Sequence, residues 1–515
     1  MSGSTNPNQR ADNGSGSDAS RTSIAVIGSG MAGLVTAYLL QRDENHSRKF
    51  DIEVFESQET LSLDSASVTI ESKDGGAAQH INQPMRDFDE GFYPNLKRMY
   101  DYLGIQCDPK KFLFSFSYMP KADPGDPSAQ DHEEAAAQAK VSFVHSSNNH
   151  QLPPIRPEGL SLWSWIGEII YLAFFFAWFI VACFWINPGK GHRKPSTMDQ
   201  DYPESLEEYF RRIHLPTYFV DRYIIPSFSS MSTCSHREML SFPANDIVQY
   251  IRRTYGAPHY LVRAGIREVE RTLSKGLNIR LGARVTSVRQ AGTSVMVCWE
   301  STSSASELAG EKIPPMSSCQ RTFDHVILAI PPNAVGAIFE PLRAETSVIP
   351  TTSVEAFIHT DYSTIPCIRS SPSPSAEVGT ASNAESQWIH LRSTPESTES
   401  IHQHPSSYII TNSPLTPIEP GKIVHRAYFT RTLRTPQSRD IVNRIFDKTS
   451  SISEEEKSGE HESRKKQPVQ WRNGDGNVWL VGSWCWDGMV LLEGCIVSAM
   501  RVADEFGVMV PWAKS

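Results

Sequence analysis

Short apolar runs that end in glycine or proline recur along the chain and predict its main strands and helices. Residues 23–41, SIAVIGSGMAGLVTAYLLQ, predict a strand, a glycine turn and a helix, and FDIEVFES predicts a second strand. FDHVILAIPPNAV (323–335) predicts a third strand, which Pro331 and Pro332 end, and residues 476–507 predict a strand followed by a helix. Strands that alternate with helices in this way are typical of an α/β fold.

One apolar run is much longer and carries no charge: the eighteen residues Ile169 to Ile186, of which eleven are Ile, Leu, Phe or Val. As a helix it would be roughly 27 Å long, close to the roughly 30 Å hydrocarbon core of a bilayer. A single crossing would place the blocks before and after it on opposite sides of the membrane, although they must meet in one domain. We therefore expect a monotopic helix in one leaflet. A helix buried in the protein or at a dimer interface, and a true span, are the alternatives.

The flanks of this run favour the monotopic interpretation. Trp163 and Trp165 precede it, and the cationic segment 190–194, KGHRK, follows it. Interfacial aromatic residues, and cations near anionic head groups, suit a helix at the membrane surface.

Composition argues against several function classes. The formal charge is −9 without a long basic tract, so no nucleic-acid partner is predicted. The eight cysteines are scattered, with no CxxC or Cys/His cluster at metal-ligand spacing, so no metal site is predicted. The first twenty residues lack the apolar core of a secretory signal, so we expect a disordered tail (1–22) and a catalytic part on the cytoplasmic side of a membrane.

The glycine turn after the first strand carries the most specific motif. Gly28, Gly30 and Gly33 form G-x-G-x-x-G. The first glycine allows the tight turn, the second lets backbone N–H groups approach a pyrophosphate, and the third lets the helix pack on the strand. The next strand ends in Glu56, placed to accept hydrogen bonds from a ribose diol. This combination predicts dinucleotide binding, of FAD or NAD, against the alternative of a glycine-rich turn in an ordinary α/β protein.

The last strand and helix form a second candidate cofactor segment. The helix begins with Glu493, Gly494 and Cys495, and a helix N-terminus can stabilise negative charge on a reduced ring system. The alternative is a plain buried unit of one strand and one helix.

In order, these blocks resemble the flavin amine oxidase and phytoene desaturase superfamily, especially its amine-oxidase-domain proteins of fungal type, over residues 23–118 and 245–510 without the insertions. The resemblance implies FAD as cofactor and a Rossmann-like FAD-binding domain of the GR2 type with an inserted α+β substrate domain. It also implies that the backbone around Val285 holds the adenine and that residues 84–86, Pro-Met-Arg, lie beside the flavin. The residues that it assigns to FAD binding are Gly28, Ser29, Gly30, Met31, Ala32, Gly33, Glu56, Met85, Val285, Gly482, Ser483, Leu492 and Glu493.

The sequence departs from this family pattern at three places. Residues 62–64, Ser-Leu-Asp, stand where the family usually has a Gly-Gly pair beside the cofactor, and Ser483 replaces an acidic residue of the C-terminal motif. No lysine between Pro331 and Trp471 has the context of the lysine that amine oxidases place beside the flavin. This last difference argues against simple amine oxidation.

Candidate catalytic residues follow from position along the chain. Trp484 and Trp486 could wall the substrate side of the ring, or could be packing residues. His80, Arg86 and His259 could transfer protons, although a lone histidine is more often a hydrogen-bonded structural residue.

The blocks and insertions together predict the domain organisation. An FAD-binding domain is expected from 23–118, 245–330 and 470–510, and a substrate domain from 119–244, which contains the apolar helix 169–186, and from 331–469. Composition predicts exposed, disordered insertions at 121–140, 301–320, 366–406 and 453–466.

The predicted function is that of a membrane-associated, FAD-dependent oxidoreductase of the oxidase or desaturase type. It would transfer a hydride from a hydrophobic small molecule to flavin N5 and pass the electrons to O₂ or another acceptor. A lipid-like, polyketide or terpenoid substrate would enter from the membrane. The alternatives are a redox-neutral flavin-dependent double-bond isomerase and a non-catalytic, membrane-tethered flavin-binding protein. The oligomeric state stays open.

Overall fold

The computed structural model describes residues 21–42, 50–70, 79–119, 140–189, 203–301, 318–366, 386–446 and 471–513. The predicted tail, apart from Arg21 and Thr22, lies outside these residues. The predicted insertion at 453–466 and most of those at 121–140 and 301–320 lie outside them too.

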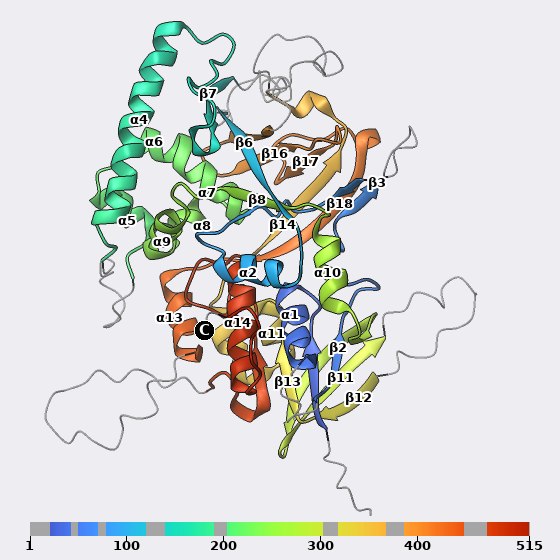
Figure 1. Ribbon diagram of the computed structural model, residues 1–515. Coiled ribbons are helices and arrows are strands. Elements are labelled where there is room, and N and C mark those ends of the chain that lie inside the picture. The colour runs from blue at the N-terminus through green and yellow to red at the C-terminus, as the bar shows by residue number, and fades with distance from the viewer. Residues whose placement is uncertain are drawn as a thin grey trace, which may run out of the picture.

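Five short parallel strands form the central sheet of the lower half of the molecule (Figure 1). The sheet order is β19-β13-β1-β2-β9, with β1 in the middle. The strands are β1 (Thr22–Ile27), β2 (Phe50–Phe55), β9 (Asn278–Arg280), β13 (His325–Leu328) and β19 (Val478–Leu480). The strands expected from the apolar runs are thus confirmed, in the predicted Rossmann-like arrangement.

Both faces of this sheet are covered, which explains why its strands are apolar throughout. Ile24 and Val26 of β1 belong to the core beneath α1 (Met31–Gln41) and α14 (Leu492–Glu505), which lie side by side. Ala25 and Ile27 point to the opposite core. That core is closed by an antiparallel sheet and by short helices, namely β10 (Ala283–Ala291), β11 (Ser294–Ser301), β12 (Ser318–Phe323), α11 (Pro332–Ile338), η5 (Glu340–Leu342) and α12 (Arg343–Ser347).

Nine strands form a second, mixed sheet in the upper half (Figure 1). Its order is β18-β14-β17-β16-β15-β6-β8-β5, and β7 pairs with β6. The strands are β5 (Phe88–Asp89), β6 (Cys107–Tyr118), β7 (Val141–Ser146), β8 (His259–Val262), β14 (Thr351–His359), β15 (Ser386–Ser393), β16 (Thr398–Gln403), β17 (Ile409–Asn412) and β18 (Ile423–Thr432). Strands β6 and β8 come from ranges predicted for the FAD-binding domain, 23–118 and 245–330, so each of these ranges contributes to both halves.

The prediction of a disordered insertion at 366–406 is wrong from Ser386 onward, because β15 and β16 occupy the middle of this sheet. Their buried polar side chains bind one another or neighbouring strands. Arg392 Nε donates to Glu399 Oε2 at 2.7 Å, and a ring nitrogen of His390 lies 2.7 Å from Ser115 Oγ on β6. The polar residues of this segment thus lie in buried strands that pair with their neighbours.

Helices gather beside the second sheet and above the first. The remaining described elements are β3 (Val68–Ile70), β4 (Gln79–Ile81), α2 (Pro94–Tyr102), η2 (Ser147–Asn149), α4 (Leu162–Trp185), α5 (Leu206–Arg212), α6 (Thr217–Phe219), the π-helical turn η3 (Val220–Ile224), α7 (Ile225–Ser232), α8 (His236–Leu240), α9 (Ala244–Thr254), α10 (Ile266–Ser274), η6 (Tyr362–Thr364), η7 (Pro420–Lys422), α13 (Pro436–Phe446) and η9 (Asp475–Asn477). The long helix α4 stands at the outer edge of the molecule (Figure 1).

Helix α4 is longer than the predicted 169–186, because it begins at the Ser161 cap, whose hydroxyl accepts from Ser164 N. Glu168, the charged residue just before the uncharged run, lies inside the helix. The Glu168 carboxylate accepts hydrogen bonds from the hydroxyls of Tyr218 and Tyr223, so its charge turns toward the protein.

Candidate functional site

The turn between β1 and α1 has the geometry that its glycines predict. Gly28 has φ +105°, a conformation that residues with a Cβ rarely adopt. A Cβ on Gly33 would lie 2.0 Å from the Gly28 carbonyl oxygen, so only glycine allows this close packing. The two glycines therefore set the path of the turn.

The N-terminus of α1 is open at the end of this turn. Its N-cap, Gly30, has no side chain to cap the helix, and the first turn carries no acidic residue. The first amides of a helix need acceptors and attract anions. Gly30, Met31 and Ala32 line a cavity, so an anionic cofactor group there would meet these amides.

Glu56 lies at the end of β2, beside the turn, as predicted. Its carboxylate accepts from Ser29 N at 3.1 Å and from Ser29 Oγ at 2.6 Å on one oxygen, and from Gln58 N at 2.9 Å on the other. The chain from Glu56 runs beside β10, because Ala283 N donates to the Glu56 carbonyl. Val285 lies two residues further along β10 from this backbone contact.

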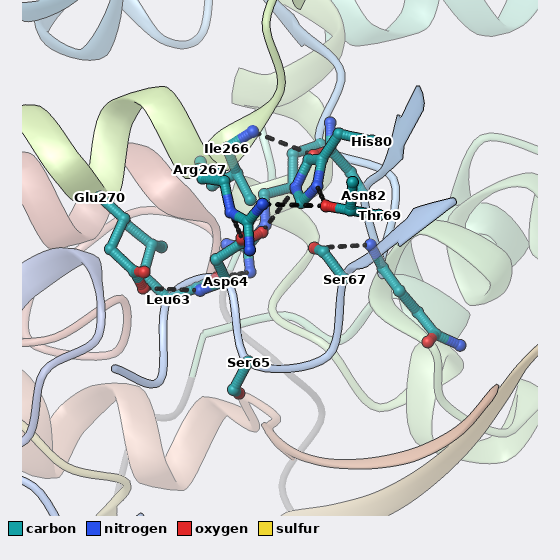
Figure 2. A network of polar contacts seen from close by, with 12 residues as sticks. Leu63, Asp64, Ser65, Ser67, Thr69, His80, Asn82, Ile266, Arg267 and Glu270 are labelled. Carbon is teal, nitrogen blue, oxygen red and sulfur yellow. Dashed lines mark hydrogen bonds and ion pairs between the residues drawn. The ribbon is translucent and has the colours of Figure 1, made fainter. Parts of the chain in front are cut away.

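The segment 62–64, where a Gly-Gly pair was expected, is held by a polar network around Asp64 (Figure 2). Asp64 N donates to Glu270 Oε2 at 2.9 Å, and Asp64 Oδ1 lies 2.9 Å from His80 Nε2. Arg267 Nε lies 3.6 Å from the other carboxylate oxygen. The network ties the segment to α10, so fixed side chains hold this loop in the absence of glycines.

The segment that the resemblance places beside the flavin contains buried polar atoms without partners. Neither side-chain polar atom of Gln83 has a hydrogen-bond partner among the described residues, and the same holds for Arg86 Nε. Arg86 Nη2 donates to Leu63 O at 2.7 Å, and Met85 packs against the core. Such orphaned groups are uncommon and call for a ligand or water.

The C-terminal motif forms one wall of the same cavity. Gly482, Ser483 and Trp484 line it, and Trp484 Nε1 donates to Ile330 O at 3.2 Å. The buried Arg434 donates to Trp484 O at 2.9 Å and to Trp486 O at 2.7 Å, which fixes the loop. Burial lowers the pKa of Arg434 to about 10, so it stays charged at neutral pH.

Glu493 has a different role from the predicted flavin contact. Its carboxylate accepts from Asn95 N and Leu96 N, both at 3.1 Å, and from Asn95 Nδ2 at 2.7 Å, and so caps the N-terminus of α2. Burial raises the pKa of this carboxyl, and these hydrogen bonds oppose the rise. Neither Glu493 nor Leu492 lines the cavity.

Four of the five candidate catalytic residues also lie outside the cavity lining, namely Arg86, Trp486, His80 and His259. Trp486 is buried against Phe92 and donates to Met489 O. His80 belongs to the Asp64 network, and His259 Nδ1 lies 3.3 Å from an Asp87 carboxylate oxygen. Among the described residues, no group of three His, Cys, Asp or Glu side chains could hold a metal ion.

The cavity has a volume of about 190 Å³ and lies where the two halves meet. Its lining comes from the dinucleotide turn (Gly30, Met31, Ala32), the end of β13 (Ala329, Ile330, Pro331), the C-terminal motif (Gly482, Ser483, Trp484, Val490, Leu491, Cys495) and the upper half (Met231, Ser232, Phe242, Thr430, Arg431, Thr432). Sequence reasoning missed the whole last group, because no local motif marks it.

Comparison with protein families gives two matches, which follow one another along the chain. Residues 26–103 match an NAD(P)-binding Rossmann-like domain, and residues 99–365, more than half of the chain, match the flavin containing amine oxidoreductase family. The chain belongs to the flavin containing amine oxidoreductase family. No curated protein sequence matches it significantly.

A solved structure shares the fold of this chain. A CLA-producing fatty acid isomerase from P. acnes superimposes with a TM-score of 0.52 at 11% identity, over 94% of this chain and 98% of that one. Cyclohexylamine oxidase from Brevibacterium oxydans gives a TM-score of 0.49 at 10% identity, over 95% of this chain and 100% of that one. At such identities the likeness concerns the fold alone.

The residues present fit the FAD of this family. The open N-terminus of α1 lies at the cavity, where a pyrophosphate needs it, and Glu56 ends β2 at the ribose position. The unpartnered Gln83 amide lies in the segment that the resemblance places beside the ring. Gly30, Met31 and Ala32 would hold the phosphates, and Ser483 and Trp484 would line the flavin end.

Proposed function

We propose that this amine oxidoreductase family member is an FAD-dependent enzyme that oxidises a hydrophobic small molecule in the cavity between its two halves. The observation that carries the proposal is the composition of the cavity wall. The dinucleotide turn and the C-terminal motif form one side, and the apolar side chains of Met231 and Phe242 form part of the other. One cavity thus joins a cofactor wall to an apolar wall, as ligand sites usually do.

FAD, when bound, supplies a two-electron acceptor. The chain's own residues then bind and orient the substrate and exclude water. Trp484 is held in one orientation by its hydrogen bond to Ile330 O, and Met231 and Phe242 offer apolar contact. A fixed aromatic wall loses little side-chain entropy on binding, which favours a defined pose.

The cavity lining favours chemistry that needs little proton transfer. Among the described lining residues none is His, Lys, Asp or Glu. Burial raises the pKa of the Cys495 thiol to about 12, so it stays protonated at neutral pH. The described lining residues thus offer no general base, so a proton released beside the hydride would pass to water.

The first experiment is the visible spectrum of the detergent-purified protein, with mass identification of the small molecule that heat releases. We expect FAD at about one per chain, and bleaching of its absorbance by a lipophilic substrate under anaerobic conditions. A colourless protein that FAD cannot reconstitute would contradict the proposal. Bound FAD that no lipophilic compound reduces or perturbs would favour the non-catalytic, flavin-binding alternative.

A redox-neutral isomerase is the second candidate. The specific observation that favours it is that the fold is shared with a fatty acid isomerase. Product formation without net consumption of O₂ or another electron acceptor would identify it, because an oxidase or desaturase must reoxidise its flavin in every turnover.

We further propose that α4 attaches the protein to one membrane leaflet, on its cytoplasmic side. Among the described helices, α4 alone is long and apolar enough to cross a membrane by length and composition. Its outer face is exposed at Trp163 (80%), Ile170 (65%), Phe174 (66%) and Trp185 (83%), residues that share one side of the helix. Terminal tryptophans suit the interface between head groups and acyl chains.

The inner face of α4 supports attachment over a span. Phe176 and Phe179 pack against Phe219 and Phe210, and Trp178 Nε1 donates to Ile213 O at 2.9 Å. A helix held along its length by its own domain can offer lipid only the other face. A second copy of this chain is a poorer partner than lipid for the exposed face of α4. A strip about 36 Å long and about 10 Å wide buries roughly 360 Å² per partner, where stable interfaces need roughly 800 Å².

Flotation with vesicles of phosphatidylcholine and phosphatidylserine tests this attachment. The double substitution of Phe174→Ser and Trp185→Ser should weaken vesicle binding at least about tenfold, since it removes two large apolar side chains from the contact. Tyr428→Ser, at an exposed aromatic residue on β18, is the matched control. Unchanged flotation, or a dimer in solution that the double variant dissociates, would contradict attachment by α4.

A further inference from the structure

Arg431 is the one charged residue among the described residues that line the cavity. It is the penultimate residue of β18, between Thr430 and Thr432, which line the cavity too. Arg431 Nε donates to Thr233 Oγ1 at 3.2 Å. No hydrogen bond or ion pair joins its two terminal nitrogens to the described part of the chain, and Arg431, which is half-buried, lines the cavity.

The charge of Arg431 has no carboxylate to balance it among the described residues. The groups that act on it are Arg86, which lowers its pKa, and Tyr93, which raises it, and burial lowers its pKa further to about 10. It is therefore protonated at neutral pH. A buried charge without a partner is costly, and a guanidinium away from water normally has an anion beside it.

The neighbouring Arg86, in contrast, has carboxylates near its guanidinium. Burial lowers the pKa of Arg86, the nearby carboxylates of Asp64 and Glu270 oppose this fall, and Leu63 O accepts from its guanidinium. Carboxylates thus lie near Arg86, whereas none acts on Arg431 among the described residues. An anion from outside the protein completes the second site.

We propose that Arg431 binds the carboxylate of the substrate, and that the substrate is an apolar carboxylic acid. This inference rests on the proposed function and names its substrate class. The planar guanidinium can donate two parallel hydrogen bonds to a carboxylate from its free terminal nitrogens. Ser232 lines the same cavity and can add a hydroxyl group beside the carboxylate, while Met231 and Phe242 can contact the hydrocarbon part.

The cofactor is the competing partner for this guanidinium. Its phosphates already have the open N-terminus of α1, on the opposite wall. Arg431 comes from the upper half, with the residues that form the apolar wall. Its position therefore favours the substrate as the source of the anion.

The test uses the FAD-loaded, detergent-purified protein and two probes of equal chain length, decanoate and decanol, titrated while the flavin absorbance is recorded. Decanoate should bind about 10- to 100-fold more tightly, the difference that hydrogen bonds to a charged group supply. R431Q should remove this preference by weakening decanoate binding alone, and R431K should keep part of it. R426Q is the matched control, because Arg426 lies on the same strand but is exposed and pairs with Glu355.

Each other outcome overturns the proposal in a distinguishable way. A protein that cannot hold FAD removes the proposed function itself. With FAD bound, equal affinity for the two probes, binding of neither, or a preference that survives in R431Q overturns the carboxylate assignment alone. If R431Q changes FAD content or the spectrum without ligand and leaves the preference intact, Arg431 serves the cofactor. If R431Q does not fold, R431K and the two probes on the unmodified protein carry the same decision.

Discussion

At the scale of single residues, the two glutamates that the sequence assigned to the cofactor have different surroundings. Glu56 ends a strand beside the glycine turn, and its oxygens are bound by the turn itself and by Gln58. Glu493 lies at the start of α14 but turns to cap α2. A carboxylate at a helix start is thus ambiguous, because it can serve a ligand or the amides of a neighbouring helix.

The capping role predicts what E493Q would do. The amide keeps an acceptor oxygen but loses the charge that three donors face, and it turns an N–H group toward them, so we expect a loss of about 1–3 kcal/mol in the free energy of unfolding. Flavin content per chain should stay the same. Urea unfolding with absorbance of the released cofactor measures both quantities.

D504N, at an exposed position of the same helix, is the control and should change stability by less than about 0.5 kcal/mol. Loss of FAD from E493Q at unchanged stability would restore Glu493 as a cofactor contact.

Residue-level prediction succeeded where the signal is local. Gly28, Gly30 and Gly33 act within one turn, so their spacing alone reveals the role. Arg431 acts through the approach of β18 to a cavity built from three distant segments, and nothing in its neighbours along the sequence marks it.

At the scale of elements, α4 shows how a helix that is apolar on all sides can still be joined firmly to a domain. Its C-terminal end is tied to α9 by Arg252, whose guanidinium donates to Cys183 O, Phe184 O and Asn187 Oδ1. Tyr209 OH donates to Ile186 O from α5. Polar contacts to the last carbonyls thus complete an attachment that is otherwise apolar.

R252A should therefore loosen the end of α4. We expect a loss of about 1–3 kcal/mol in stability and faster proteolytic cleavage after Trp185, because the last carbonyl groups lose their donors. Limited proteolysis followed by mass spectrometry locates the cleavage. R253A changes an exposed neighbour and is the control. Equal cleavage of the two variants would contradict the role given to Arg252.

The prediction of helices and strands failed where a polar segment is buried. β15 and β16 read as a Ser/Thr-rich insertion, yet Arg392, Glu399 and His390 are buried between other strands. Polar side chains in a central strand become visible only when the partners that satisfy them are known, and those partners lie on β6 and β16.

At the scale of the whole molecule, burial of histidines predicts the response to acid. Burial lowers the pKa of His145, His359 and His404 to about 4, and that of His390 and His402 to about 3. The unfolded chain takes up protons at these histidines below pH about 6.5, whereas the folded chain does not until pH about 4 or lower. Stability is therefore lost as pH falls from about 6.5 to about 4, by up to about 1.4 kcal/mol per pH unit for each histidine.

Urea midpoints measured between pH 4 and pH 8 check this, and the double substitution of His390→Gln and His402→Gln should flatten the slope. His259 provides a control of opposite sign. Burial alone would lower its pKa, but Asp87 outweighs burial and leaves the pKa raised, so H259Q should steepen the acid loss. A slope that neither change alters would contradict the assignment.

The partition into two halves was the least predictable feature. The parallel pairing of β6 with β15 joins residues 111–118 to 386–393, and β1 pairs with β13 some 300 residues later. Such pairings leave no trace in a local pattern. The sequence therefore predicted β1, β2, β13 and β19 of the first sheet but assigned the ranges that contain β6 and β8 to the FAD-binding domain only.

The order of the first sheet also limits when the dinucleotide-binding fold can form during synthesis on the ribosome. β1 carries the glycine turn near the beginning of the chain, but its sheet is completed by β19 and its helix α1 packs against α14, both from the last forty residues or so. β1 therefore has a partner on one side only until β13 emerges, about 300 residues later, and α1 stays uncovered until α14 follows. We expect a polypeptide that stops before β19 to lose FAD, because it lacks the C-terminal motif that lines the cavity and the helix that covers α1.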